Sequence, residues 1–238
     1  MEPVFRTPLS LTICPACSLA QLTHSVDRDL LYRTYFYESG TSDSMRQHLK
    51  ALAEEATTVT RLPQRGAVLD IGSNDGTLLR AIGSIPGFSG PKFGFEPCQK
   101  FTPDGLVIAP TYFSRKAVEQ CNLPEQYDLI TSIAMFYDLD DPVPFCLDIG
   151  SLLSEKGVWC LEMNYLPLML RDGAFDFICH EHVALWSLRT LEIALDWAGL
   201  EVFHASLNAI NGGSLRAYIG HPGQHPIHPG VSALRETE

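Results

Sequence analysis

The chain has 238 residues, 45% of them hydrophobic, and its mean hydropathy of +0.03 predicts a globular protein with a core to bury. A formal net charge of −11 lacks the basic surface that phosphate backbones require, which excludes nucleic acid as a partner and favours a small molecule. No window approaches about 18 consecutive apolar residues and the start "MEPVFRTPLS" does not resemble a signal peptide, so we expect a cytoplasmic protein without a membrane partner.

Residues 1–60 differ from the rest of the chain in their sequence pattern, and we expect them to form a lid ahead of the main domain. They contain a short extended piece at "CPACSLAQL", the aromatic cluster "LYRTYFYESG", and a helix that begins after Thr41 or Ser42 as N-cap. The helix is predicted by an apolar stripe at helical spacing, made of Met45, Leu49, Leu52, Ala53 and Ala56.

Residues 61–222 alternate short apolar runs with helical periods, which is typical of a doubly wound α/β sheet. The predicted strands are "AVLDIG", "KFGFE", "GLVIAP", "YDLITSIAM" and "GVWCLEM", followed by the closing pair "LEVFHASL" and "GGSLRAYIG". The predicted helices are "GTLLRAIGSI", "PVPFCLDIGSLL" and a third that aligns Leu188, Leu191, Leu195 and Ala198. Residues 223–238 are rich in Pro, Gly and His and are expected to be a loose tail.

The first strand-to-helix turn, "LDIGSNDGTLL", predicts a ligand site, because ligands bind at the carboxyl ends of strands in open parallel sheets. Its glycines do not have the spacing of a dinucleotide fingerprint, and Asp75 would repel a pyrophosphate. S-adenosylmethionine carries cationic groups and no phosphate, so an acidic turn suits it. The residues expected to bind this cofactor are Asp70, Gly72, Ser73, Asn74, Asp75 and Gly76.

The ends of two further strands extend the predicted cofactor site. Glu96 ends the second strand, where a carboxylate can accept both hydroxyls of a ribose. At the end of the fourth strand, Ser132, Ile133 and Ala134 are expected to lie against the adenine, with core filling as the alternative. The acids that follow in "MFYDLDDP", together with Asp148, are interpreted as acidic residues at the start of a helix rather than as a cation site.

The stretch "FDFICHEHVALWS" places His180, Glu181 and His182 side by side between apolar residues. A zincin needs two histidines four residues apart, but the residue four past His180 is Ala184, so a metal site of that kind is excluded. The residues themselves leave two interpretations open, a general base with its helper or a polar cap before a helix.

Six segments in this order resemble the S-adenosylmethionine-dependent C-methyltransferases that act on nucleotide-linked deoxy-keto sugars. They are "CPACSLAQL", the aromatic cluster leading into "YESGTSDSM", "LDIGSNDGTLL", "GFEP", "FDFICHEHVALWSL" and "NGGSLRAY". The resemblance runs through most of the chain. It implies a class I methyltransferase fold, in which a Rossmann-like, seven-stranded mixed sheet follows a small N-terminal lid.

The same resemblance implies roles for several residues. His182 would remove a proton from the carbon beside a sugar ketone, which agrees with the capacity of a neutral imidazole to act as a base. Glu181 would orient the imidazole or hold a substrate hydroxyl. Tyr35 or Tyr37 would steady the enolate oxygen or the sugar, with packing aromatics of a lid as the alternative. His180 is expected to be structural. No metal is needed for this chemistry.

The chain departs from the family in two places. Family members carry two Cys-x-x-Cys pairs that form a zinc knuckle, whereas the seven cysteines here contain one such pair, Cys14 and Cys17. Because structural zinc needs four ligands, we expect half of a knuckle and reduced thiols rather than a working zinc site. Family members also continue into a C-terminal domain, so residues 223–238 are interpreted as its remnant. The alternatives to C-methylation are O-methylation of a small natural product and a truncated, non-catalytic adenosylmethionine-binding module.

Overall fold

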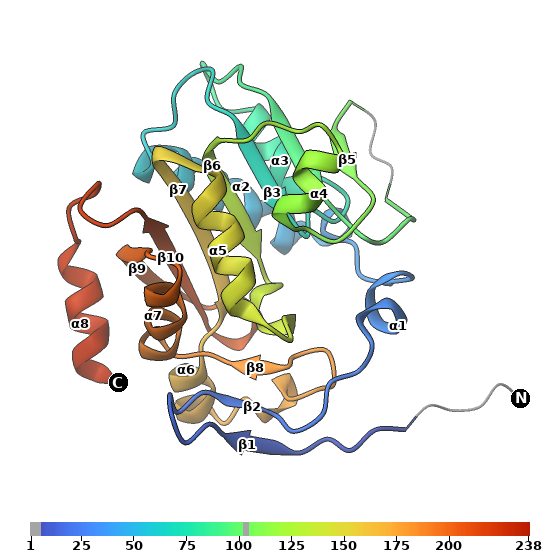
Figure 1. Cartoon of the computed structure of the whole chain (residues 1–238), viewed down its shortest axis with the longest axis vertical. Helices are drawn as coiled ribbons and strands as arrows, with labels where there is room; N and C mark the ends of the chain where they lie inside the picture. The colour runs from blue at the N-terminus through green and yellow to red at the C-terminus, as the bar shows by residue number, and fades with distance from the viewer. Residues whose placement is uncertain (1–5, 102–104) are drawn as a thin grey trace, which may run out of the picture.

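The computed structural model describes residues 6–101 and 105–238, and it centres on one seven-stranded sheet (Figure 1). The strand order is β5-β4-β3-β6-β7-β10-β9. Neighbouring strands from β5 to β7 are parallel, whereas β10 is antiparallel to both β7 and β9. The strands span Val68–Ile71 (β3), Lys92–Phe95 (β4), Val107–Ala109 (β5), Tyr127–Ile133 (β6), Leu153–Asn164 (β7), Glu201–Asn208 (β9) and Ser214–Gly220 (β10). The expected seven-stranded mixed sheet is therefore confirmed.

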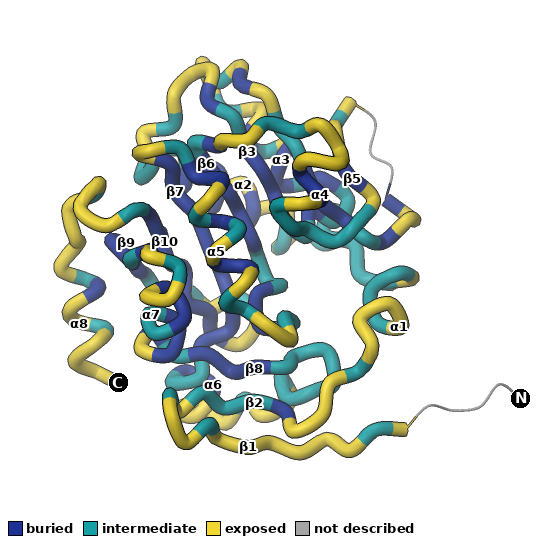
Figure 2. The backbone as a smooth tube through the Cα atoms, in the orientation of Figure 1, coloured by how far each residue is buried: buried dark blue, intermediate teal, exposed yellow. Residues whose placement is uncertain are grey.

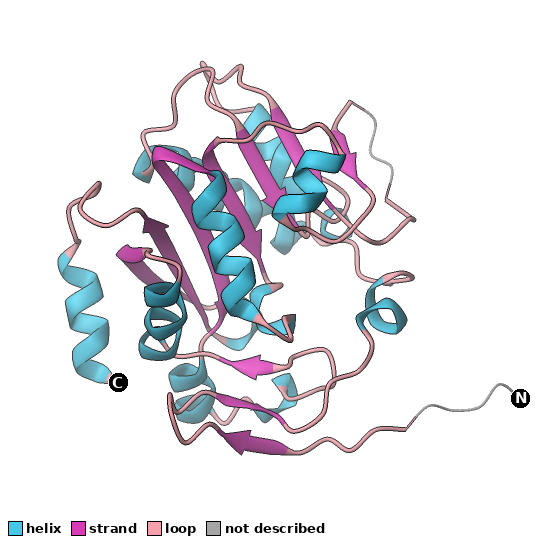
Figure 3. Ribbon diagram, in the orientation of Figure 1, coloured by secondary structure: helices cyan, strands magenta, loops and turns pink. Residues whose placement is uncertain are grey.

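Helices cover both faces of this sheet, as the alternating sequence pattern predicts (Figure 3). One face carries α2 (Asp43–Val59) and α3 (Thr77–Gly83), which pack on each other. The other face carries α4 (Arg115–Gln120), α5 (Pro142–Leu152) and α7 (Leu188–Trp197). The dark strands of Figure 2 lie between these layers, because parallel strands covered on both faces are buried on both sides.

Helix α2 was expected to belong to a lid, but it packs directly on the sheet. Its stripe of Leu49, Leu52, Ala53 and Ala56 is buried in one apolar cluster with the α3 residues and with Tyr218 of β10. Ser42 caps the helix by accepting a hydrogen bond from the backbone N–H of Met45, as the sequence predicts.

A second, three-stranded antiparallel sheet lies at one end of the molecule, in the order β1-β2-β8. It joins the N-terminal hairpin of β1 (Leu11–Ile13) and β2 (Ala20–Leu22) to β8 (Ala184–Leu185), directly after the "HEH" segment. Cys14 and Cys17 lie in the hairpin turn, and no third Cys, His or acid among the described residues joins them in a metal-like cluster. This sheet holds the "HEH" segment against the N-terminal region.

The C-terminal residues differ from the expected loose tail. Helix α8 (Pro229–Thr237) packs along β9 and buries Val231 completely. Glu238 accepts hydrogen bonds from the backbone N–H groups of Leu188 (2.6 Å) and Arg189 (2.9 Å), which caps the start of α7. Packing on the sheet therefore orders a segment whose composition predicts a flexible end.

The remaining short elements are α1, α6 and four 3-10 turns, and together with α4 and the small sheet they were not predicted. Their bounds are Arg28–Tyr32 (α1), Leu166–Asp172 (α6), Ser39–Thr41 (η1), Phe136–Asp138 (η2), Phe175–Phe177 (η3) and Ile210–Gly212 (η4). Among the described residues, the helices are too short or too polar to cross a membrane.

Candidate active site

A cavity of about 640 Å³ opens at the carboxyl ends of β3, β4 and β6, where an α/β sheet of this kind binds its ligands. Its lining comes from the strand ends and the loops that follow β5 and β6, from the N-terminal segment between α1 and the start of α2, from the segment between η3 and His182, and from Asn211. Three of its lining residues are non-glycine residues with positive φ, namely Asn74 (49°), Ala134 (56°) and Asn211 (52°). Such strained backbone concentrates at functional sites.

The turn after β3 forms one side of this cavity. Gly72 has φ of 72°, which glycine adopts without strain, and its N–H donates to the carbonyl of Phe95 at 2.9 Å. Asp70 is buried and accepts a hydrogen bond from Thr131 Oγ1 at 2.7 Å. Burial raises the pKa of Asp70 to about 7, although the Thr131 hydrogen bond opposes the shift. The expected residues Asp70, Gly72, Ser73 and Asn74 all line the cavity.

Glu96 lies at the end of β4 with its side chain largely buried, as the second strand end predicts. The backbone N–H groups of Asn74 and Cys98 donate to its two carboxylate oxygens, each at 2.8 Å. Burial raises the pKa of this carboxyl, and the two amides lower it in part. The carboxylate is therefore held in one orientation at the cavity wall, where it retains acceptor capacity for the hydroxyls of a ribose.

Asp75 and Gly76, which were predicted to bind the cofactor, are not among the residues that line the cavity. The carboxylate of Asp75 accepts hydrogen bonds from Thr77 at the start of α3, through its N–H (3.0 Å) and its Oγ1 (2.7 Å). Its other oxygen accepts from the N–H of Gly40 at 2.8 Å. Asp75 therefore caps a helix and fastens the N-terminal segment instead of facing a cation.

The side chain of Asn74 makes the same connection from the neighbouring position. Its Oδ1 accepts from the N–H of Ser39 at 3.0 Å, and its Nδ2 donates to the carbonyl of Tyr37 at 3.1 Å. The turn after β3, which was predicted to contact the cofactor, thus also holds the N-terminal segment in place.

The residues at the end of β6 divide between the core and the cavity. Ser132 is completely buried, and its Oγ accepts a hydrogen bond from Trp159 Nε1 at 2.7 Å, so its expected contact with adenine is wrong. Ile133 and Ala134 do line the cavity. Because successive side chains of a strand point to opposite faces, Ser132 points into the layer opposite its neighbours.

His182 faces the cavity from the opposite wall. Its Nδ1 lies 2.6 Å from the carbonyl oxygen of Phe177, and because a carbonyl can only accept, Nδ1 carries the proton. The ring stacks on Phe177 with centroids 3.9 Å apart and meets Tyr137 edge-on at 4.7 Å. This arrangement fixes the imidazole and makes Nε2 the nitrogen that can take up a proton.

The neighbours of His182 in the "HEH" segment point elsewhere. The Nε2 of His180 contacts the carbonyl of Thr7 at 2.9 Å, so this ring joins the segment to the N-terminal region. Glu181 does not line the cavity, but its carboxylate, Cys179 Sγ and a His182 nitrogen lie within 4.8 Å of one another. This is the one described His, Cys and acid group close enough to hold a metal ion.

The aromatic cluster of the N-terminal segment lines another part of the cavity. Tyr35 and Tyr37 line it as expected, with ring centroids 6.5 Å apart. Tyr32, which was not predicted, also lines it and donates a hydrogen bond to the backbone carbonyl of Glu181 at 3.2 Å. Burial raises the pKa of all three phenols, so they remain hydrogen-bond donors.

Asp138 is the main site residue that the sequence reasoning missed. It was interpreted as part of a helix entry, but it ends η2 and lines the cavity together with His182. Asp141 is the N-cap of α5 without a side-chain cap bond, and Asp148 accepts from the N–H of Arg115 at 2.9 Å. The available signal for Asp138 was its position just after the fourth strand, where ligand-binding residues gather.

A model of the methyltransferase domain family matches residues 41–205, more than half of the chain. The chain belongs to this family. C-methyltransferase NovU of Streptomyces niveus is 25% identical over 238 residues, which covers 97% of this chain and 56% of NovU. The chain thus spans a little over half the length of this methyltransferase relative.

Solved methyltransferase structures share the fold at low sequence identity. An S-adenosylmethionine-dependent methyltransferase from Clostridium acetobutylicum superposes with a TM-score of 0.55 at 12% identity, covering 75% of this chain and 92% of that one. The plantazolicin methyltransferase BpumL in complex with SAH gives 0.54 at 13% identity, covering 72% and 81%. The expected class I methyltransferase fold is confirmed. The expected cofactor is S-adenosylmethionine. The turn at Gly72 and the carboxylate of Glu96 fit this group.

Proposed function

We propose that this methyltransferase methylates a carbon next to a ketone of a deoxy sugar, with His182 as the general base. The observation that carries the proposal is the orientation of one imidazole. His182 donates from Nδ1 to the carbonyl of Phe177, which leaves Nε2 free to take up a proton, and the residue lines the cavity that also contains Gly72 and Glu96. A base and a cofactor site in one cavity are what carbon methylation requires.

The chemistry follows from the acidity of a ketone. A hydrogen on the carbon beside a carbonyl can be removed by a positioned base, and the C–H electron pair then makes that carbon nucleophilic. When bound, S-adenosylmethionine supplies an electrophilic methyl group. The cavity residues hold the reactants close together, and orientation of this kind supplies a large part of an enzyme's acceleration.

The acceptor side supports a keto sugar as the substrate class. Tyr35 and Tyr37 offer hydroxyl donors to sugar oxygens, and the rings of these two residues and of Tyr32 provide apolar surface for a deoxy sugar face. The likeness to C-methyltransferase NovU supports carbon as the methylated atom, and the six sequence segments that resemble the sugar C-methyltransferases extend the proposal to a nucleotide-linked sugar.

Two measurements test the proposal in sequence. Addition of S-adenosylhomocysteine should raise the melting temperature of the protein, while NAD should not, because a ligand that binds the native state stabilises it. The protein should then exchange the hydrogen beside the ketone of nucleotide-linked keto-deoxy sugars for deuterium from D2O, before any methyl transfer. An O-methyltransferase has no reason to catalyse this exchange.

A matched pair of histidine variants identifies the base. We expect His182→Gln to lower the exchange rate by about 100-fold or more and His180→Gln to leave it within a few-fold of wild type. Both variants should still bind S-adenosylhomocysteine. Equal rates for His182→Gln and wild type would show that this ring is not the base.

A further inference from the structure

An unpaired carboxyl oxygen lies beside the proposed base. The Oδ1 atom of Asp138 is buried and has no hydrogen-bond partner among the described residues. Asp138 follows Tyr137, whose ring contacts His182 at 4.7 Å, and both Asp138 and His182 line the cavity. A buried oxygen without a partner costs more free energy in a carboxylate than in a neutral acid, so its burial favours the protonated form, while other atoms of Asp138 line the cavity.

The surroundings of Asp138 favour its neutral form. Burial raises the pKa of this carboxyl well above its usual range, and the nearby carboxylate of Glu181 and thiol of Cys179 raise it further. His182 and the hydroxyl of Tyr32 act in the opposite direction. Tyr35 and Tyr137 also face this group, and burial raises the pKa of each phenol. A neutral carboxylic acid carries a proton to donate, whereas a carboxylate can only accept.

We propose that Asp138, as a neutral acid, donates a hydrogen bond to the ketone oxygen of the acceptor and stabilises the enolate formed there. The proposal rests on the function proposed above and adds the group that receives the developing charge. The ketone oxygen and the acidic carbon are separated by one atom, so the donor and the base must stand next to each other. Asp138 and His182 both line the cavity, and the ring of Tyr137, the residue before Asp138, contacts the imidazole.

Removal of the proton beside the ketone forms the enolate. The C–H bond breaks and its proton goes to Nε2 of His182. The electron pair of that bond forms the new C=C bond, and the π pair of the carbonyl moves to the oxygen. Asp138 keeps its proton and shares it with this oxygen in a hydrogen bond, which strengthens as negative charge develops.

Substitutions at Asp138 separate this role from a second one, in which an ionised carboxylate would stabilise the His182 imidazolium. Asp138→Asn retains an N–H donor but cannot become an anion, and Asp138→Ala retains neither property. With the dTDP-linked keto-deoxy sugars that wild type exchanges, we expect deuterium exchange to fall about 100-fold or more in Asp138→Ala. Exchange should stay within about 10-fold of wild type in Asp138→Asn. Asp172→Asn, at an exposed acid outside the cavity, serves as the control.

The pH profile adds a readout that a purely structural role would not change. Wild-type exchange should fall at high pH as Asp138 loses its proton, and Asp138→Asn should abolish this decline because an amide does not ionise. Equal losses in Asp138→Asn and Asp138→Ala, with S-adenosylhomocysteine binding intact in both, would overturn the donor role. Wild-type exchange rates in Asp138→Ala would overturn it as well.

A spectroscopic measurement tests Asp138 independently of the acceptor. In protein labelled with carbon-13 at the aspartate carboxyls, NMR should contain one signal that reports a protonated carboxyl at neutral pH and disappears in Asp138→Asn. An Asp138 signal that reports a carboxylate at neutral pH would overturn this inference and leave the base role of His182 standing. Absence of exchange by wild type on every keto sugar would instead overturn the proposed function.

Discussion

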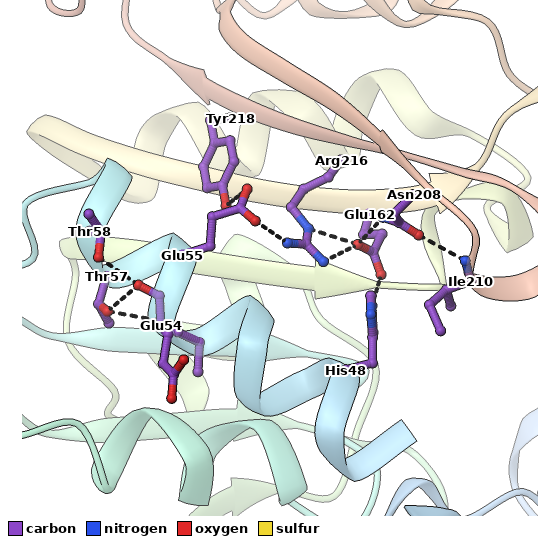
Figure 4. A network of polar contacts seen from close by, with 11 residues as sticks. His48, Glu54, Glu55, Thr57, Thr58, Glu162, Asn208, Ile210, Arg216 and Tyr218 are labelled. Atoms are coloured by element: carbon purple, nitrogen blue, oxygen red, sulfur yellow. Dashed lines mark hydrogen bonds and ion pairs between the residues drawn. The ribbon is translucent and has the colours of Figure 1, made fainter. Parts of the chain in front are cut away.

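Glu162 of β7 and Arg216 of β10 face each other across adjacent strands and form a buried ion pair, with Nη2 and Oε2 2.7 Å apart (Figure 4). The other oxygen of Glu162 meets Nε2 of His48 in α2 at 2.5 Å. Arg216 continues to Glu55 of α2 at 2.7 Å, and Glu55 accepts from the hydroxyl of Tyr218 at 2.9 Å. This network attaches α2, whose first turns line the cavity, to the sheet.

Breaking the network from one side should destabilise the protein strongly. Glu162→Gln leaves Arg216 buried without its counter-ion, so we expect a loss of about 3–5 kcal/mol in the free energy of unfolding, measured by urea denaturation. Arg171→Gln, which removes a fully exposed ion pair with Asp172, should have no measurable effect. A Glu162→Gln variant as stable as wild type would show that the network is not a structural tie.

The buried carboxyl of Asp70 should make stability depend on pH. Its pKa is raised from 3.8 to about 7 in the folded protein, so the folded state holds its proton more tightly than the unfolded state. The corresponding stability is fully present below about pH 4 and is lost as pH rises through about 7, at about 1.4 kcal/mol per pKa unit. Asp70→Asn should remove this decline in a series of urea titrations.

Thr131→Val should change the same pH dependence in the opposite direction from Asp70→Asn. It deletes the hydrogen bond that lowers the pKa of Asp70, so the decline should extend to higher pH. A wild-type profile in Thr131→Val would contradict the assignment of the decline to Asp70.

The contact between Asp75 and Gly40 should hold the N-terminal segment over the cavity. A Cβ atom at Gly40 would lie 2.4 Å from Asp75 Oδ2, so Gly40→Ala should break this contact while Asp75 still caps α3 through Thr77. We expect faster amide hydrogen exchange by about 10-fold or more in residues 37–41, together with weaker binding of S-adenosylhomocysteine.

Asp75→Ala removes both contacts at once and should additionally lower overall stability by about 1 kcal/mol through the lost cap. If Gly40→Ala leaves hydrogen exchange in the segment unchanged, the contact does not hold the segment in place.

Gly94 of β4 lies so close to the turn after β3 that a larger residue should not fit there. A Cβ atom at Gly94 would lie 2.6 Å from Ser73 Oγ and 2.9 Å from its Cβ. Gly94→Ala should therefore destabilise the protein by about 1–3 kcal/mol and weaken binding of S-adenosylhomocysteine, measured by calorimetry. Adding Ser73→Gly should recover much of the stability, because it removes the atoms in conflict.

Gly150→Ala in α5 is the matched control. Its Cβ would meet Ala198 O at 3.5 Å, an ordinary contact, so it should preserve binding and stability. Equal effects of the two alanine variants would show that the approach at Gly94 is not special.

The sequence by itself determined the sheet, the α2 stripe, the Gly72 turn and Glu96, because periodicity and strand ends are local properties of the chain. Only the tertiary structure decided where the side chains of Asp75 and Ser132 point. A polar residue in a turn can contact a ligand or a distant backbone group, and Asp75 contacts the N–H of Gly40, 35 residues away.

Long-range pairing decided the rest of the site. β8 pairs with β2 from more than half of the chain away, and this pairing holds the "HEH" segment where His182 lines the cavity. Asp138 looked like a helix cap because three acids precede or adjoin the proline that opens α5. Its burial beside His182 depends on packing between segments far apart in sequence, which no local pattern encodes.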